Sequence, residues 1–221
     1  MRSFFILILF INTLSVFFLL TSASSSFAYR SSDIQKTIKG FIYENYGNYN
    51  KSLESSKNIL KKSDSPIGYY YLAKLYLKNK NFKKAEYYIN KTIKISHKKN
   101  KNNYYILKTK IYLSENKIKK SLDTLNFILK KDPSNRHALL LIAGIYKFQK
   151  KFTAALYYLN LLKLYYPDDI DSYYELSKIY IEENKPAKAI KNLRGVIKLN
   201  PYFKESYFQL AAIYTAEKKT P

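Results

Sequence analysis

Residues 136–167 read RHALLLIAGIYKFQKKFTAALYYLNLLKLYYP, and the pattern returns 34 residues later as IDSYYELSKIYIEENKPAKAIKNLRGVIKLNP in residues 170–201. In both stretches apolar residues recur at i, i+3, i+4 and i+7, which is the spacing of one face of an α-helix. A short polar segment interrupts each stretch, and a proline, which cannot continue a helix, closes it. Each stretch therefore predicts two helices joined by a turn.

The same period extends over most of the chain. The positions that keep it are Pro133, Pro167 and Pro201; Tyr112, Tyr146, Tyr180 and Tyr214; Ser121, Ala155 and Ala189; and Leu125, Leu159 and Leu193. A single helix pair cannot bury its own apolar face. A repeated pair therefore predicts neighbours that stack around one continuous core.

This pattern resembles the tetratricopeptide repeat, a helix–turn–helix unit of 34 residues. In the unit at 170–203 the family's places fall at Tyr173, Leu176-Ser177, Tyr180, Ala189, Leu193, Val196 and Pro201. The resemblance implies an all-α, right-handed helix–turn–helix solenoid after an N-terminal signal peptide. We expect units at about 33–65, 66–101, 102–135, 136–169 and 170–203 and a terminal helix at 204–218. Two places depart from the pattern: Lys108-Thr109 replaces the leucine-small pair, and His97 replaces a closing proline.

The composition is strongly basic and lacks cysteine. Lys and Arg number 39 against 16 Asp and Glu, a formal net charge of +23. A surplus of this size favours anionic partners, and the amino-acid bias of an AT-rich genome is the alternative explanation. The chain has no Cys, two His and five Gly, which excludes a disulfide framework, a thiolate metal site and a glycine-rich phosphate loop. We expect no enzymatic activity, no cofactor and no metal.

Residues 1–28 have the order of a secretory signal peptide. Arg2 precedes an apolar run from Phe4 to Leu20, small polar residues follow, and Ser26-Phe27-Ala28 resembles a cleavage site before Tyr29. The alternative is an uncleaved membrane anchor formed by residues 4–20. Either interpretation places residues 29–221 outside the cytoplasm, in the periplasm or cell envelope of a bacterium, where we expect no nucleic-acid partner.

The resemblance implies that the first helices of successive units line a concave groove that binds a peptide or protein segment. Between the core places of these helices run an apolar row and a row of spaced lysines. The predicted groove residues are Tyr70, Lys74, Ile106, Lys110, Leu140, Lys147, Tyr174, Lys178 and Phe208. They suit a segment that carries apolar anchors and carboxylates. The alternative is that the apolar row only completes the packing between units.

The second helices begin with a recurring set of lysines. These are Lys83, Lys84, Lys119, Lys120, Lys150, Lys151, Lys188 and Lys191. We expect them to face outward, where they suit contact with anionic lipid or an envelope polymer. A solvated face is the alternative interpretation. Six of the 16 acidic residues lie between Asp168 and Glu183, so the unit at 170–203 holds the acidic part of a basic chain.

The terminal helix carries Tyr207, Leu210, Ala211 and Tyr214 on its packing side. We expect this side to pair with a second copy of the chain or with a partner, because stacked repeats cover such faces. The sequence thus indicates an extracytoplasmic scaffold that binds a protein partner in its groove, in envelope assembly or maintenance. The alternative is a basic surface-associated protein that contacts lipid or polyanion through its lysines.

Overall fold

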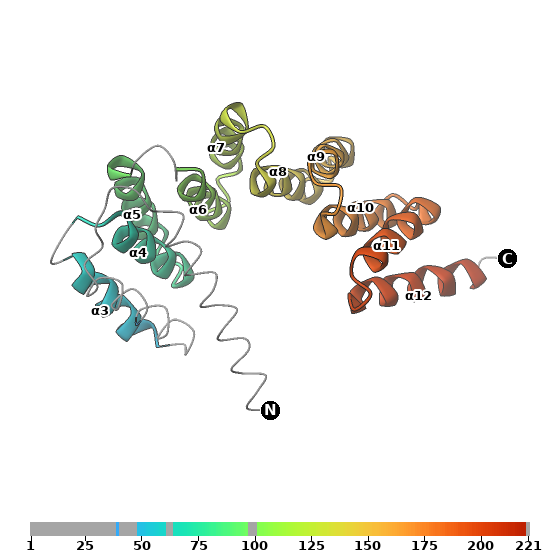
Figure 1. Cartoon of the computed structure of the whole chain (residues 1–221), viewed down its shortest axis with the longest axis horizontal. Helices are drawn as coiled ribbons and strands as arrows, with labels where there is room; N and C mark the ends of the chain where they lie inside the picture. The colour runs from blue at the N-terminus through green and yellow to red at the C-terminus, as the bar shows by residue number, and fades with distance from the viewer. Residues whose placement is uncertain (1–38, 40–47, 61–63, 97–100, 220–221) are drawn as a thin grey trace. The chain divides into compact units, whose positions relative to one another are not determined.

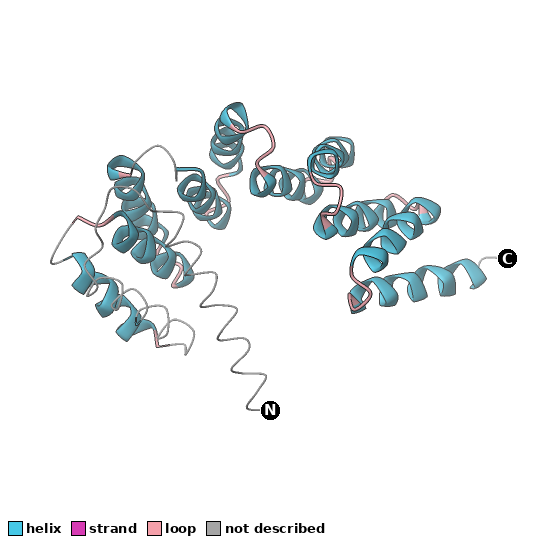
Figure 2. Cartoon of the chain, viewed as in Figure 1, coloured by secondary structure: helices cyan, strands magenta, loops and turns pink. Residues whose placement is uncertain are grey.

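The computed structural model describes residues 39, 48–60, 64–96 and 101–219, and it divides the chain into two compact units, residues 1–68 and 69–221. The described residues form ten helices and no strand, which confirms the all-α prediction for this part of the chain (Figures 1 and 2). The predicted signal peptide at 1–28 lies outside the described residues. Among the residues that are described, no helix combines the length and the apolar character needed to cross a bilayer.

The first unit contains one described helix, α3 (Tyr49–Leu60). Asn48 caps its N-terminus, because the Asn48 Oδ1 atom accepts a hydrogen bond from the backbone N–H of Lys51 at 3.2 Å. Such a side-chain acceptor satisfies one of the backbone donors that every helix leaves free in its first turn.

The second unit consists of consecutive helix pairs. The helices are α4 (Pro66–Lys78, which begins just before the unit), α5 (Phe82–Ile95), α6 (Lys101–Ser114), α7 (Ile118–Lys131), α8 (Arg136–Phe148), α9 (Phe152–Tyr165), α10 (Ile170–Glu182), α11 (Pro186–Leu199) and α12 (Lys204–Lys219). From α5 onward, each second helix packs against the first helix of the next pair. The helices therefore stack in chain order, and each contacts mainly its sequence neighbours.

Small side chains at the repeat positions allow this close packing. Ala85, Ala155 and Ala189 are fully buried, and Ser121 is fully buried at the same place in α7. Ser121 remains compatible with the core because its hydroxyl donates to the backbone carbonyl of Lys117 at 3.1 Å. Around these contacts lie fully buried leucines and isoleucines. The periodic residues thus form the core that the sequence predicts.

The turn inside each pair has one recurring geometry. At Lys80, Asn116, Lys150 and Asn184 the backbone adopts the left-handed conformation, with φ between 54° and 57°. The next residue donates its N–H to the carbonyl of the repeat tyrosine in the preceding helix, as in Lys151 to Tyr146 at 2.9 Å and Lys185 to Tyr180 at 2.8 Å. This is the Schellman motif, which ends a helix and reverses the chain. Glycine is the residue that favours this conformation, and none of the four turns has one.

We expect Lys80→Gly to stabilise the protein by up to about 1 kcal/mol, because glycine relieves the cost of a Cβ atom in the left-handed region. Asn116→Gly is the matched comparison and should gain less, since asparagine tolerates this conformation. Urea unfolding of both variants measures the difference. A Lys80→Gly protein less stable than the parent would show that the turn carries no such strain.

Candidate functional site

A groove of about 700 Å³ lies between α8 and α10 in the second unit. Its apolar floor includes Leu140, Ala143 and Gly144 from α8 and Ile179 from α10. Ala143 and Ile179 also belong to the buried cluster that joins α8, α9 and α10, so the floor is fixed by the core beneath it. The groove therefore has a rigid base built from two consecutive first helices.

Gly144 and Phe148 give the groove its open character. A Cβ atom added to Gly144 would meet no other atom within 4 Å, so the space above this residue is empty. Glycine within a helix costs about 0.5–1 kcal/mol relative to alanine, and nothing in the packing requires it here. Phe148, at the end of α8, leaves 81% of its surface exposed. The groove thus combines empty space at Gly144 with the exposed aromatic ring of Phe148.

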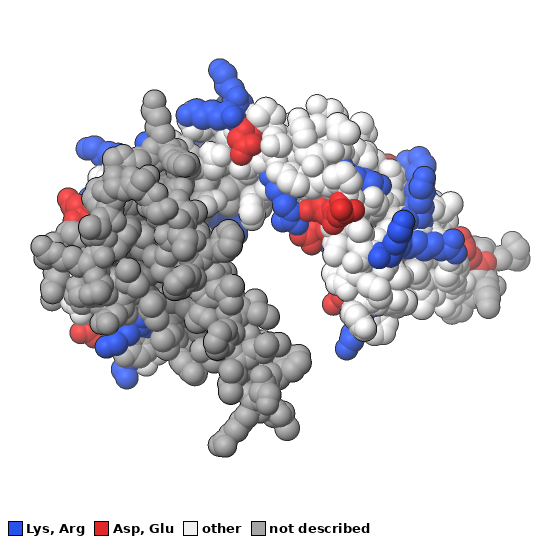
Figure 3. All heavy atoms as spheres, viewed as in Figure 1, with Lys and Arg blue, Asp and Glu red and all other residues white. Residues whose placement is uncertain are grey.

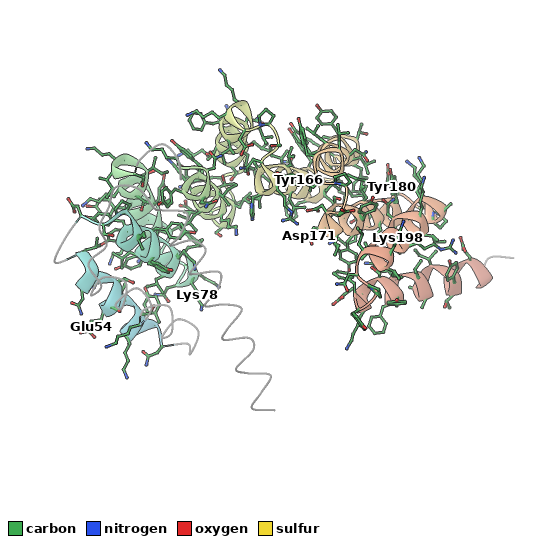
Figure 4. The ribbon with its side chains drawn as sticks, viewed as in Figure 1. Glu54, Lys78, Tyr166, Asp171, Tyr180 and Lys198 are labelled. Carbon is green, nitrogen blue, oxygen red and sulfur yellow. The ribbon has the colours of Figure 1, made fainter. Side chains whose placement is uncertain are left out.

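Three of the charged side chains that line the groove, Lys147, Asp171 and Glu175, form ion pairs. Glu175 of α10 accepts a hydrogen bond from Lys147 Nζ of α8 at 2.5 Å and also pairs with Lys178. At the other end of the groove, Arg136 pairs with Asp169 and with Asp171 (Asp171 is labelled in Figure 4). Two ion-pair clusters thus join the first helices of consecutive repeats.

Asp169 has a structural role beside this pairing. Its Oδ1 atom accepts from the backbone N–H of Ser172 at 2.7 Å and so caps the N-terminus of α10. A carboxylate is well placed there, because the exposed N–H groups of a helix N-terminus carry partial positive charge. In the equivalent position before α8, Asn135 accepts from the N–H of Ala138 at 3.1 Å.

The nine predicted groove residues do not all come together. Leu140 and Lys147 line the groove, and Lys178 lies next to it through the shared carboxylate of Glu175. Ile106 is 8% exposed and belongs to the core between α6, α7 and α8. Lys110 is exposed on α6. The apolar row therefore serves partly as packing between repeats.

The other aromatic members of the predicted row lie elsewhere. The Tyr70 ring packs on Tyr104, with ring centroids 5.4 Å apart, and the Tyr174 ring packs edge-on against Phe203 at 5.0 Å. Phe208 of α12 is 73% exposed. The Lys74 Nζ atom lies 5.6 Å from the centre of the Tyr71 ring.

The eight lysines predicted to face outward are all exposed, but Lys150 lines the groove between α8 and α10, so the outward prediction is wrong for that residue. Three of them also contact the tyrosine of their own repeat. Their Nζ atoms lie 5.4–5.7 Å from the tyrosine ring centres, in the pairs Lys84 and Tyr76, Lys120 and Tyr112, and Lys188 and Tyr180. A cation over an aromatic face gains about 0.5–1 kcal/mol at exposed sites. In α9 the equivalent residue is Ala154.

Sequence reasoning missed Phe148 and the role of Glu175. The other repeats carry Lys78, Ser114 and Glu182 at the place of Phe148. Phe148 is the one aromatic residue at this otherwise polar position, and this difference could have identified it from the sequence. Glu175 lies three residues before Lys178 and so on the same face of α10, but its second contact, with Lys147, depends on how the two repeats stack.

We expect Glu175→Gln to destabilise the protein by about 1 kcal/mol, because Lys147 and Lys178, which both contact Glu175, would lose their shared counter-charge. Glu182→Gln is the matched control, since Glu182 lines the same groove, is exposed and forms no ion pair in the described part of the chain. Urea unfolding at low and high salt measures both variants. Equal effects at the two positions would contradict the assigned role of Glu175.

The structure of the chain resembles solved structures, whereas comparisons of its sequence found no match. No family model matches the chain, and no curated protein matches it. The solved structures that resemble it include TTC0263, a thermophilic TPR protein of Thermus thermophilus, with a TM-score of 0.63, 14% identity, and 83% of this chain and 99% of that chain covered.

Two further similar structures have descriptions that bear on function. YrrB, described as a TPR protein with an unusual peptide-binding site, has a TM-score of 0.55 at 14% identity, covering 81% of this chain and 93% of that chain. PilW, described as a widely conserved type IV pilus biogenesis factor, has a TM-score of 0.64 at 17% identity, covering 86% and 93%. Together with the repeat geometry, these likenesses show that the chain has the tetratricopeptide-repeat fold.

Proposed function

We propose that this chain is a non-catalytic interaction scaffold that holds a segment of another protein in the groove between α8 and α10. The observation that carries the proposal is the groove's open apolar floor at Gly144, next to the exposed ring of Phe148. Binding sites are typically concave, mostly apolar and supplied with a few polar groups. The groove has each of these features.

The similar structures support a binding role. YrrB is described as having a peptide-binding site and PilW as a biogenesis factor, and both have the fold found here. In a stacked-repeat protein each unit adds surface next to that of its neighbours, which suits an extended partner better than a small substrate.

The charge pairing in the groove indicates how a segment would be held. Lys147 and Lys178 already contact Glu175, so a carboxylate on the ligand would have to displace that residue. Apolar contacts with Leu140, Ile179 and Phe148 need no such exchange. We therefore propose that an apolar side chain anchors the segment, and that binding persists at salt concentrations that screen surface charge.

We further propose that the scaffold works outside the cytoplasm, in assembly or maintenance of a bacterial envelope. The support for this location is the signal-peptide pattern of residues 1–28, with its apolar run at 4–20 and the small residues before Tyr29.

Gly144→Gln tests the groove. The added side chain would extend into space that is empty in the structure, so we expect peptide binding to fall at least tenfold while the helix becomes slightly more stable. A displayed library of random peptides is selected on the full chain at high salt, and the affinities of enriched peptides are then measured on the parent and the variant.

The matched control is Lys83→Gln, which places the same side chain at an exposed position on α5, away from the groove. Peptides should bind this control and the parent equally. Enriched peptides that bind the Gly144→Gln protein as tightly as the parent would place the binding site elsewhere.

Expression in a bacterial host tests the proposed location. Mass spectrometry of the exported protein should find Tyr29 as the first residue, since signal peptidases cut after small residues such as Ala28. Replacing Ala28 with a bulky residue, Ala28→Phe, should prevent the cut. A full-length parent protein in the membrane fraction would favour the anchor, and a soluble full-length protein in the cytoplasm would refute export.

A further inference from the structure

The second helices of the four repeats each present one exposed stripe, which we call the outer stripe. It consists of residues at i, i+4, i+7 and i+11, which lie on one face of a helix. The four outer stripes are Lys83, Tyr87, Asn90 and Lys94 on α5; Lys119, Asp123, Asn126 and Lys130 on α7; Thr153, Tyr157, Asn160 and Leu164 on α9; and Ala187, Lys191, Arg194 and Lys198 on α11. All sixteen residues are exposed.

The outer stripe of α9 differs from the other three because it carries no charge. The stripes on α5, α7 and α11 contain two, three and three charged residues. At the last place of the stripe the other helices have a lysine, whereas α9 has Leu164, which is 74% exposed. Tyr157 is 63% exposed in the same stripe. The repeat itself therefore does not require apolar residues at these positions.

The whole of α9 is unusually apolar for a helix at the surface. Lys163 is the single charged residue within Phe152–Tyr165, and its Nζ atom lies 3.9 Å from the centre of the Tyr173 ring. A helix that is apolar all round is normally buried on all sides. Here one side packs in the core through Ala155, Leu159 and Leu162, and the opposite side exposes Tyr157 and Leu164.

Basic residues flank this apolar face. Lys151 precedes α9, and the outer stripes of the neighbouring second helices have net charges of +1 on α7 and +3 on α11. Figure 3 shows blue side chains over α7 and over α11, with white surface over α9 between them. An apolar centre between basic flanks is the pattern of proteins that lie at the surface of an anionic membrane.

We propose that the outer face of α9 docks on an anionic lipid surface. Leu164 and Tyr157 enter the interfacial region, where tyrosine and leucine are well suited, and the flanking lysines contact the anionic headgroups. Charge complementarity favours lipid over a second copy of the chain, because a copy would bring the same basic flanks and be repelled. The docking uses a face formed by second helices and does not depend on the groove between α8 and α10.

The absence of cysteine from the chain allows a direct test. Leu164→Cys and Tyr157→Cys each give the full chain one thiol, which is labelled with a polarity-sensitive fluorophore. Lys110→Cys, at an exposed position on the first helix α6, is the matched control. Each protein is mixed with phosphatidylcholine vesicles that contain about 30% phosphatidylglycerol and a nitroxide-labelled lipid, or with vesicles of phosphatidylcholine and the nitroxide lipid alone.

We expect the labels at 164 and 157 to shift to shorter wavelength and lose roughly half of their emission on the anionic vesicles, with little change for the label at 110. Insertion of the apolar residues 4–20 alone would affect the three labels alike, and that result would overturn the proposal. Absence of vesicle binding would overturn it as well. A shift without vesicles that grows with protein concentration would assign the face to a second copy instead.

Discussion

The close approach of two helices at one small side chain is the contact on which the second unit depends. At Ala85, Ser121, Ala155 and Ala189 no side chain larger than a hydroxymethyl group separates the paired helices, and each of these residues is fully buried. The larger leucines and isoleucines can then interdigitate on both sides. Because interiors pack as densely as crystals, a bulkier residue at these places would push apart both the pair and the neighbour stacked on it.

The distribution of charge follows from the same stacking. Successive first helices lie close enough for Arg136 and Lys147 of α8 to reach carboxylates of α10. Asp171 and Glu175 of α10 therefore offset the charges of Arg136 and Lys147. On the second helices, whose outer stripes contain Asp123 as their single acidic residue, lysines remain at the surface and three of them lie over the tyrosine of their own repeat. Charge is thus spread unevenly over the described part of the second unit.

The fold was predictable because it depends on period and residue size, and both can be read directly from the sequence. Tyr112, Leu125 and Ala155 recur at fixed spacing, and each is buried in the structure. The site was less predictable, since it depends on contacts between residues far apart in the chain. Ile106 and Leu140 have the same place in the repeat, yet Ile106 is buried in the core and Leu140 lines a groove. Gly144, one turn after Leu140 in α8, leaves empty space, and the groove that includes this space forms only when α10 of the next repeat packs beside α8.

The order of contacts along the second unit has a mechanical consequence. Each helix packs mainly on its neighbours in sequence, and among the described helices no extensive contact joins distant repeats of the kind that would make the array unfold all at once. A pulling force applied along the stack would therefore open one repeat at a time. The length gained at each step would be that of a single helix pair, and a released repeat could fold back onto its neighbour when the tension falls.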